Sequence, residues 1–187
     1  MTERIVVIGT SLGGLNALSV VLGGLPRDFP LPVAIVQHRT KEPDSALADL
    51  LQRRTSLPVG DAEDKMPVQA GRVYLAPPDY HLLVGREQFA LSIDAPVSHA
   101  RPSVDVLFDS AASSFGSGVL AVVLTGANGD GANGAVVVKL RGGRVIVQDP
   151  LDAESSVMPA TAVSKGVADV VLPLRDIAAQ VVRWSRD

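Results

Sequence analysis

Short apolar runs rich in β-branched residues alternate along this chain with segments whose hydrophobic residues recur at helical spacing. Such runs are typical of strands buried on both faces. Strands that alternate with helices predict a parallel sheet with helices on both sides. The expected strands are 4–8, 33–38, 119–124, 144–148 and 168–171, with helices opening near residues 14, 44, 103, 132, 156 and 173. We therefore expect an α/β fold with a doubly wound, mostly parallel sheet.

One region departs from this pattern. Between about residues 72 and 93, short apolar runs are separated by Pro77-Pro78-Asp79 and by Gly85-Arg86-Glu87. Proline, glycine and aspartate favour turns, so these runs predict an antiparallel meander near residues 72–93.

The composition of the chain argues against several classes of function. The chain has 187 residues, a length that fits one domain, and we expect a single domain over 1–187. The sequence has no cysteine, which excludes thiolate nucleophiles, cysteine-ligated zinc and iron–sulfur clusters. The three histidines are far apart and argue against a metal site, so no cofactor is expected. A net charge of −3 argues against nonspecific nucleic-acid binding.

Residues 5–26 carry no charge, which imitates a membrane segment. The stretch contains five glycines and several polar side chains, and no signal-peptide features flank it. A buried strand, a glycine turn and a core-facing helix explain it better. We therefore expect no membrane insertion and a cytoplasmic protein.

Three strand ends supply a serine, a histidine and an aspartate. Ser11 follows the first strand, His38 follows the second, and Asp130 lies in the glycine-rich loop after the strand 119–124. In open parallel sheets the ligand site lies outside the carboxyl ends of the strands. A nucleophile, a base and an orienting carboxylate are what acyl transfer to serine requires. Gly9 to Gly13 also fits G-x-S-x-G on a strand-to-helix turn.

Other interpretations of these residues stay open at this stage. Ser11 could be the N-cap of the helix that follows it, and Asp130 the N-cap of the next helix. The glycine loop could bind a phosphate, although Ser11 stands where a dinucleotide fingerprint needs glycine. His38 could be a solvated strand end.

Several further residues are given structural roles. His81 and His99 are expected at the surface or rim, and Asp105 is expected to complement the helix dipole in the first turn of its helix. Four basic residues are expected to form a solvated face, two of them bordering the site: Arg39, Lys41, Arg53 and Arg54.

The residues resemble those of the CheB-type chemotaxis protein-glutamate methylesterases over nearly the whole chain. The ordered combination of motifs is specific, although each motif alone is not. The matching segments are Ile8 to Gly14, Val36-Gln37-His38, Tyr74 to His81, Arg101 to Phe108, Leu124 to Gly131 and Ser156 to Pro159.

The resemblance implies a serine esterase that removes methyl from glutamyl methyl esters on the cytoplasmic helices of chemoreceptors and releases methanol, with deamidation of receptor glutamines as a second activity. By position, Ser11 matches the nucleophile, His38 the base and Asp130 the orienting carboxylate. The backbone at Leu12 and Ala127 matches the oxyanion-binding region.

This sequence departs from the family pattern in three ways. Leu12 stands where many members have threonine, and Ala127 stands where many have methionine. The glycine and asparagine after Ala127 are in reversed order. Members also commonly carry a receiver domain, and we expect none in this chain; a separate receiver would be a partner. These departures leave a second hypothesis open, a weakly active or inactive partner-binding module of the same fold. A nucleotide or phosphosugar binder is a third.

Overall fold

The computed structural model describes residues 3–38 and 46–186. At its centre is a sheet of seven strands in the order β3-β4-β2-β1-β7-β8-β9, in which every neighbouring pair is parallel. The strands are β1 (Ile5–Thr10), β2 (Val33–Gln37), β3 (Val59–Asp61), β4 (Val73–Leu75), β7 (Val119–Val123), β8 (Arg144–Gln148) and β9 (Val170–Leu172). The predicted doubly wound parallel sheet is confirmed.

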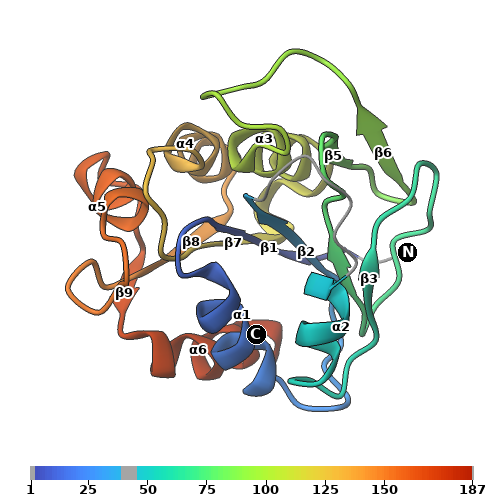
Figure 1. The fold of residues 1–187 in the computed structure, drawn as a ribbon, viewed down its shortest axis with the longest axis horizontal. Helices are drawn as coiled ribbons and strands as arrows, with labels where there is room; N and C mark the ends of the chain where they lie inside the picture. Colours follow the sequence, from blue (N-terminus) through green and yellow to red (C-terminus); the bar gives the residue numbers. More distant parts are fainter. Residues whose placement is uncertain (1–2, 39–45, 187) are drawn as a thin grey trace.

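Helices cover both faces of this sheet (Figure 1). On one face lie α1 (Gly14–Gly23), α2 (Ala46–Gln52) and α6 (Leu174–Arg186). On the other lie α3 (Val104–Phe115), α4 (Ala132–Leu140) and α5 (Val157–Ser164), and a 3-10 turn, η1 (Gly116–Gly118), leads from α3 into β7. Each face encloses its own hydrophobic core.

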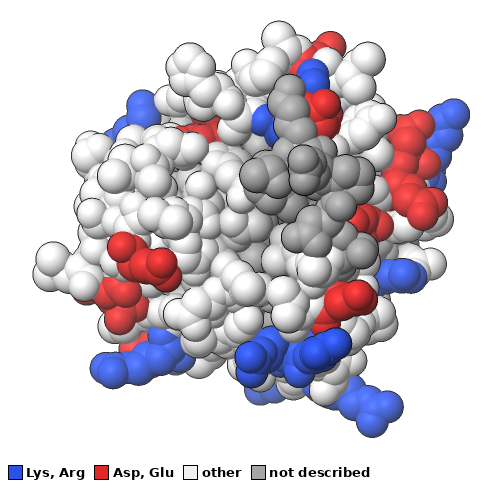
Figure 2. Space-filling model, in the orientation of Figure 1, with Lys and Arg blue, Asp and Glu red and all other residues white. Residues whose placement is uncertain are grey.

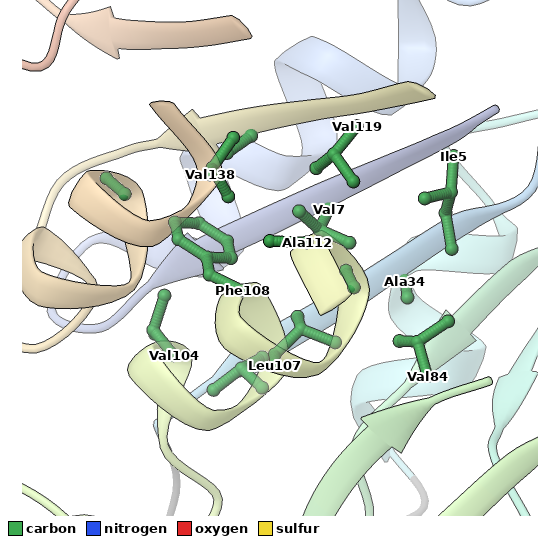
Figure 3. Close-up of a cluster of buried hydrophobic side chains, with 14 of the residues drawn as sticks. Ile5, Val7, Ala34, Val84, Val104, Leu107, Phe108, Ala112, Val119 and Val138 are labelled. Atoms are coloured by element: carbon green, nitrogen blue, oxygen red, sulfur yellow. The ribbon is translucent and has the colours of Figure 1, made fainter. Parts of the chain in front are cut away.

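The core beneath α3 fixes this helix, which carries part of the site, against the sheet. Figure 3 shows Phe108 of α3 next to Val138 of α4, and Ala112 of α3 next to Val7 of β1. Phe108 is completely buried. Truncating such a side chain to alanine costs about 3–5 kcal/mol, because contacts are lost and a cavity remains. The beginning of α3 is therefore held rigidly relative to β1.

The antiparallel part is smaller than the sequence pattern predicts. Only β5 (His81–Val84) and β6 (Phe89–Ser92) form a hairpin, closed by a hydrogen bond from the Gly85 N–H to the Gln88 carbonyl. The run 72–76 was wrongly assigned to the meander, because its strand β4 pairs in parallel with β2 and β3. A three-residue apolar run indicates a strand but does not specify the direction of its neighbour.

The uncharged stretch 5–26 forms β1, a glycine turn and α1, as predicted. Within residues 3–38 and 46–186, no helix is long and apolar enough to cross a membrane. The last strand begins two residues later than expected, at Val170–Leu172. The helix that was expected to open near residue 44 is α2, and its predicted N-cap, Asp44, lies outside the described residues.

The order of the strands in the sheet indicates where a ligand site is expected. The chain runs from β1 to β2, then to the edge strand β3 and back to β4 between them, before it forms β7 on the other side of β1. The carboxyl ends of β1 and β7 therefore flank the switch point, where open α/β sheets bind ligands.

Candidate active site

The turn after β1 is tied to both neighbouring strand ends. The Ser11 N–H donates to the carbonyl of Thr125, beyond β7, at 3.0 Å. From β2, the Gln37 side-chain amide donates to the carbonyl of Ser11 at 2.8 Å and to that of His38 at 2.9 Å. Gln37 thus joins the backbones of two candidate catalytic residues, a role that the sequence analysis missed.

Two glycines allow this turn. Gly13 has a φ of 79°, a left-handed conformation that glycine adopts without strain. Gly14 lies so close to Gln37 that a Cβ built on it would be 1.8 Å from Gln37 Oε1. Any side chain at Gly14 would displace Gln37 and, with it, the link between Ser11 and His38.

The Ser11 hydroxyl is free for chemistry. The N-cap of α1 is Gly13, without a side-chain cap, so Ser11 does not cap this helix. Its carbonyl accepts the Gly14 N–H at 2.9 Å, and within the described part of the chain its hydroxyl makes no hydrogen bond. The side chain borders an open cleft of about 560 Å³ whose lining is Ser11, Leu12, Gly13, Gly14, Leu15, Asn16, Gln37, His38 and Glu154.

His38 and Asp130 form a direct pair at this cleft. His38 Nε2 lies 2.8 Å from Asp130 Oδ2, and the side chain of Asp130 is completely buried. Since an ionised carboxylate only accepts hydrogen bonds, Nε2 carries the proton of this contact. His38 is therefore not an isolated solvated strand end, and its Nδ1 is the nitrogen left to act as a base.

The sequence of α3 keeps Asp130 in place. Three donors at the start of this helix hold its carboxylate: the Ser103 hydroxyl at 2.8 Å and the backbone N–H groups of Val104 at 2.7 Å and Asp105 at 3.0 Å. Burial alone raises the pKa of a carboxyl, but the hydrogen bonds from His38, from the two N–H groups and from Ser103 outweigh it. The pKa of Asp130 is thus lowered, and the group stays ionised opposite His38.

Asp130 caps a helix, but not the one that follows it. The N-cap of α4 is Gly131, and it is Asp105 that accepts the N–H groups of Gly131 at 2.9 Å and Gly134 at 2.7 Å. Asp105 is nearly buried, and desolvation together with the charge of Asp130 raises its pKa against the opposing hydrogen bonds. A helix-dipole role alone was therefore the wrong explanation of Asp105, because its side chain reaches across to α4.

Asn128 is a further residue of the site that the sequence analysis missed. Its side-chain nitrogen lies 3.2 Å from His38 Nδ1, and its Oδ1 accepts the Asp130 N–H at 3.1 Å. The available signal was the reversed order of glycine and asparagine in this loop, which places an amide two residues before the aspartate.

Ser11 and His38 border the same cleft, but no hydrogen bond joins their side chains among the described residues. The predicted chain of contacts is thus present from His38 to Asp130 and open at its first step. Catalytic hydrogen bonds are often long before substrate binds.

Two backbone N–H groups are available on the loops that follow β1 and β7. In the described ranges, the N–H groups of Leu12 and Ala127 have no intramolecular acceptor. Thr125 links the turn after β1 to the segment before α5, since its hydroxyl donates to the Leu12 carbonyl at 2.9 Å and accepts the Ser155 N–H at 2.8 Å. Free donors on two adjoining loops suit a developing oxyanion.

The remaining predicted residues have mixed outcomes. His81 is buried, not at the rim: its Nδ1 accepts the Ser103 N–H at 3.2 Å, which helps to hold the beginning of α3. His99, Arg53 and Arg54 are exposed, as expected. The other two basic residues of the predicted solvated face, Arg39 and Lys41, lie outside the described residues.

The described lining of the cleft is poor in charge. Glu154 is the one charged group among its lining residues in the described part of the chain, and Leu12 and Leu15 are exposed at its edge. In the view of Figure 2, most of the described charged side chains lie toward the edge of the face. Across residues 3–38 and 46–186, no group of three or more acidic or histidine side chains is placed to hold a metal ion.

Comparison with known proteins gives a consistent result. The family model described as CheB methylesterase matches residues 6–181. A Leptospira interrogans protein, provisionally named protein-glutamate methylesterase/protein-glutamine glutaminase, is 41% identical over all of this chain and 97% of its own length. A Hahella chejuensis protein named protein-glutamate methylesterase/protein-glutamine glutaminase 1 is 42% identical over 98% of this chain, which spans only 52% of that protein.

A solved structure extends the likeness to three dimensions. The crystal structure of the Thermotoga maritima CheB methylesterase catalytic domain superposes with a TM-score of 0.95, at 37% identity, covering 98% of this chain and 100% of that one. Sequence and fold agree, and the chain belongs to the CheB methylesterase family.

Proposed function

We propose that this protein hydrolyses glutamyl methyl esters on the cytoplasmic helices of chemoreceptors, releasing methanol, with Ser11 as nucleophile, His38 as base and Asp130 as orienting carboxylate. The observation that carries the proposal is the buried Asp130 carboxylate 2.8 Å from His38 Nε2, at a cleft that Ser11 borders. Family membership supports the same chemistry.

The proposed reaction starts with attack of Ser11 Oγ on the ester carbonyl while its proton passes to His38 Nδ1. Asp130 accepts the hydrogen bond from Nε2–H and stabilises the imidazolium that forms. The N–H groups of Leu12 and Ala127 donate to the oxyanion, and loss of one such donor typically costs about 10²–10³ in rate. Collapse of the intermediate expels methoxide, which leaves as methanol with the proton from His38.

Water completes the cycle. His38 Nδ1 takes a proton from a water molecule, whose oxygen attacks the glutamyl-serine ester. Breakdown of this second intermediate frees the glutamate side chain and returns the proton to Ser11. Deamidation of a receptor glutamine follows the same steps with ammonia as the leaving group.

The weakly charged cleft supports a neutral ester or amide as substrate, since Leu12 and Leu15 at its edge are apolar. Among the described residues, no lysine or arginine side chain lines the cleft. The proposed substrate also places the protein in the cytoplasm.

The test measures methanol release from membranes that contain methylated chemoreceptors. Ser11→Ala is expected to abolish release while the circular dichroism spectrum stays unchanged. Ser19→Ala is the matched control, because the Ser19 hydroxyl only donates to the Leu15 carbonyl within α1. Equal release by wild type and Ser11→Ala would refute the proposal, and a wild type that binds receptors without releasing methanol would favour an inactive binding module.

A further inference from the structure

Both ring nitrogens of His38 have a partner. Nε2 contacts Asp130 at 2.8 Å, and Nδ1 contacts the side-chain amide nitrogen of Asn128 at 3.2 Å. Rotating the ring by 180° would exchange each nitrogen with a carbon and break both contacts. The two contacts together therefore define one ring orientation.

The donors and acceptors also define one neutral tautomer. Asp130 accepts, so Nε2 carries a hydrogen, and Nδ1 is left with a lone pair that accepts from the Asn128 amide. In the proposed reaction this same lone pair must take the proton of Ser11. Asn128 and Ser11 thus compete for one atom.

We propose that Asn128 occupies the base nitrogen of the substrate-free enzyme and must release it before Ser11 can be activated, an inference that rests on the proposed function. Asn128 is a positioning residue that acts through His38. The bond from the Asp130 N–H to Asn128 Oδ1 keeps the amide facing the ring.

The loop couples this release to substrate. Asn128 directly follows Ala127, whose N–H is a proposed oxyanion donor, and both Ala127 and Gly129 are exposed. An ester carbonyl that binds the Ala127 N–H acts one residue away from the amide that holds Nδ1. Binding at this point therefore shifts Asn128 away from His38 Nδ1. The base nitrogen becomes free to accept the proton of Ser11 only when substrate is bound.

The test compares rates of fluorophosphonate labelling at Ser11, which needs the base but no receptor. Asn128→Ala is expected to label about 2- to 10-fold faster than wild type, the factor that corresponds to losing one neutral hydrogen bond. Asn133→Ala is the matched control: the Asn133 side-chain amide donates to the Asp105 carboxylate at 3.4 Å and, among the described residues, makes no hydrogen bond to His38. Its rate is expected to equal that of wild type.

A second variant distinguishes an effect on the tautomer of His38 from an effect on the shape of the loop that carries Asn128. Asn128→Asp keeps an oxygen for the Asp130 N–H but replaces the donor to Nδ1 with an acceptor, which favours a proton on Nδ1. It is expected to label more slowly than wild type, opposite in direction to Asn128→Ala. Unchanged or slower labelling of Asn128→Ala would overturn the inference.

Nitrogen-15 NMR of the histidine rings gives a readout independent of reactivity. In the neutral form of the ring, His38 is expected to carry its hydrogen on Nε2, and the Nδ1 resonance is expected to move in Asn128→Ala but not in Asn133→Ala. A hydrogen on Nδ1, or an unmoved resonance, would contradict the inference. A wild type that does not label at all would instead refute the hydrolase itself, so the two failures are distinguishable.

Discussion

Two aspartates hold the N-termini of α3 and α4, and each of them caps the helix to which it does not belong. Asp130, just before α4, binds the N-terminus of α3, and Asp105, inside α3, binds the N-terminus of α4. Both are buried and both accept two backbone N–H groups. As helix caps they are equivalent, yet only Asp130 contacts His38.

Their difference lies in what else each carboxylate meets. Asp130 uses both oxygens for strong donors, so hydrogen bonding outweighs burial and its pKa is lowered. Both backbone bonds of Asp105 go to one oxygen, and burial beside the charge of Asp130 raises its pKa. A cap becomes part of a candidate active site when one of its oxygens also faces a base, as Oδ2 of Asp130 does, so Asp105 is a natural control for Asp130.

The largest expected effect is on activity in Asp130→Asn. An amide nitrogen facing His38 Nε2 turns that atom into an acceptor and moves the ring hydrogen to Nδ1, the nitrogen that must take the proton of Ser11. Methanol release is expected to fall by about 10⁴, as for the wrong tautomer in other triads. Steady-state assays measure this, and a loss below about tenfold would contradict the assigned role.

A smaller effect is expected from Ser103→Ala. This change removes one of the donors to Asp130 Oδ1 but leaves the N–H of Asp105 on the same oxygen. The free energy of unfolding is expected to fall by about 1 kcal/mol. Urea denaturation checks this value, and an unchanged midpoint would show that the hydroxyl does not hold the carboxylate.

Asp105→Asn is expected to change less. Both backbone N–H groups bind Oδ1, and an asparagine oxygen in that position still accepts them. Stability is expected to stay within about 1 kcal/mol of wild type, and methanol release within about threefold. A loss of activity as large as that of Asp130→Asn would show that Asp105 is not merely a cap.

The pH dependence of stability should have opposite signs for the two groups. Because the pKa of Asp130 is lowered on folding, its contribution is present above about pH 4 and is lost as pH falls through the folded-state pKa. Because that of Asp105 is raised, its contribution is present below about pH 4 and is lost as pH rises through the folded-state pKa.

Urea denaturation between pH 3 and pH 8 tests both signs. The stability difference between wild type and Asp130→Asn is expected to grow with rising pH, whereas wild type should lose stability relative to Asp105→Asn. Parallel profiles for the two variants would mean that the carboxylates are in equivalent environments.

The two aspartates also show which parts of the candidate site can be predicted from the sequence and which cannot. Strand-end placement predicted Ser11, His38 and Asp130 at one edge of the sheet, because parallel strands bring their carboxyl ends to one edge. It could not reveal that Asp105 and Asp130 cap each other's helices, since this depends on how α3 packs beside α4. Local pattern likewise placed His81 outside the core and the strand 73–75 in the meander, because neither burial nor strand direction is a local property.

Gln37 and Asn128 were missed for a related reason. Each acts through a side-chain amide on a residue distant in the sequence: Gln37 on the Ser11 carbonyl and Asn128 on the His38 ring. Amides have no characteristic spacing for such contacts, so only the folded chain identifies their partners.

Mass spectrometry of the fluorophosphonate adduct is the direct test of Ser11 as a nucleophile that depends on Asp130 through His38. This assignment predicts stoichiometric modification of Ser11 in wild type and in Asp105→Asn, and almost none in Asp130→Asn under the same conditions. An adduct on another residue, no adduct in wild type, or equal labelling of the two aspartate variants would contradict it.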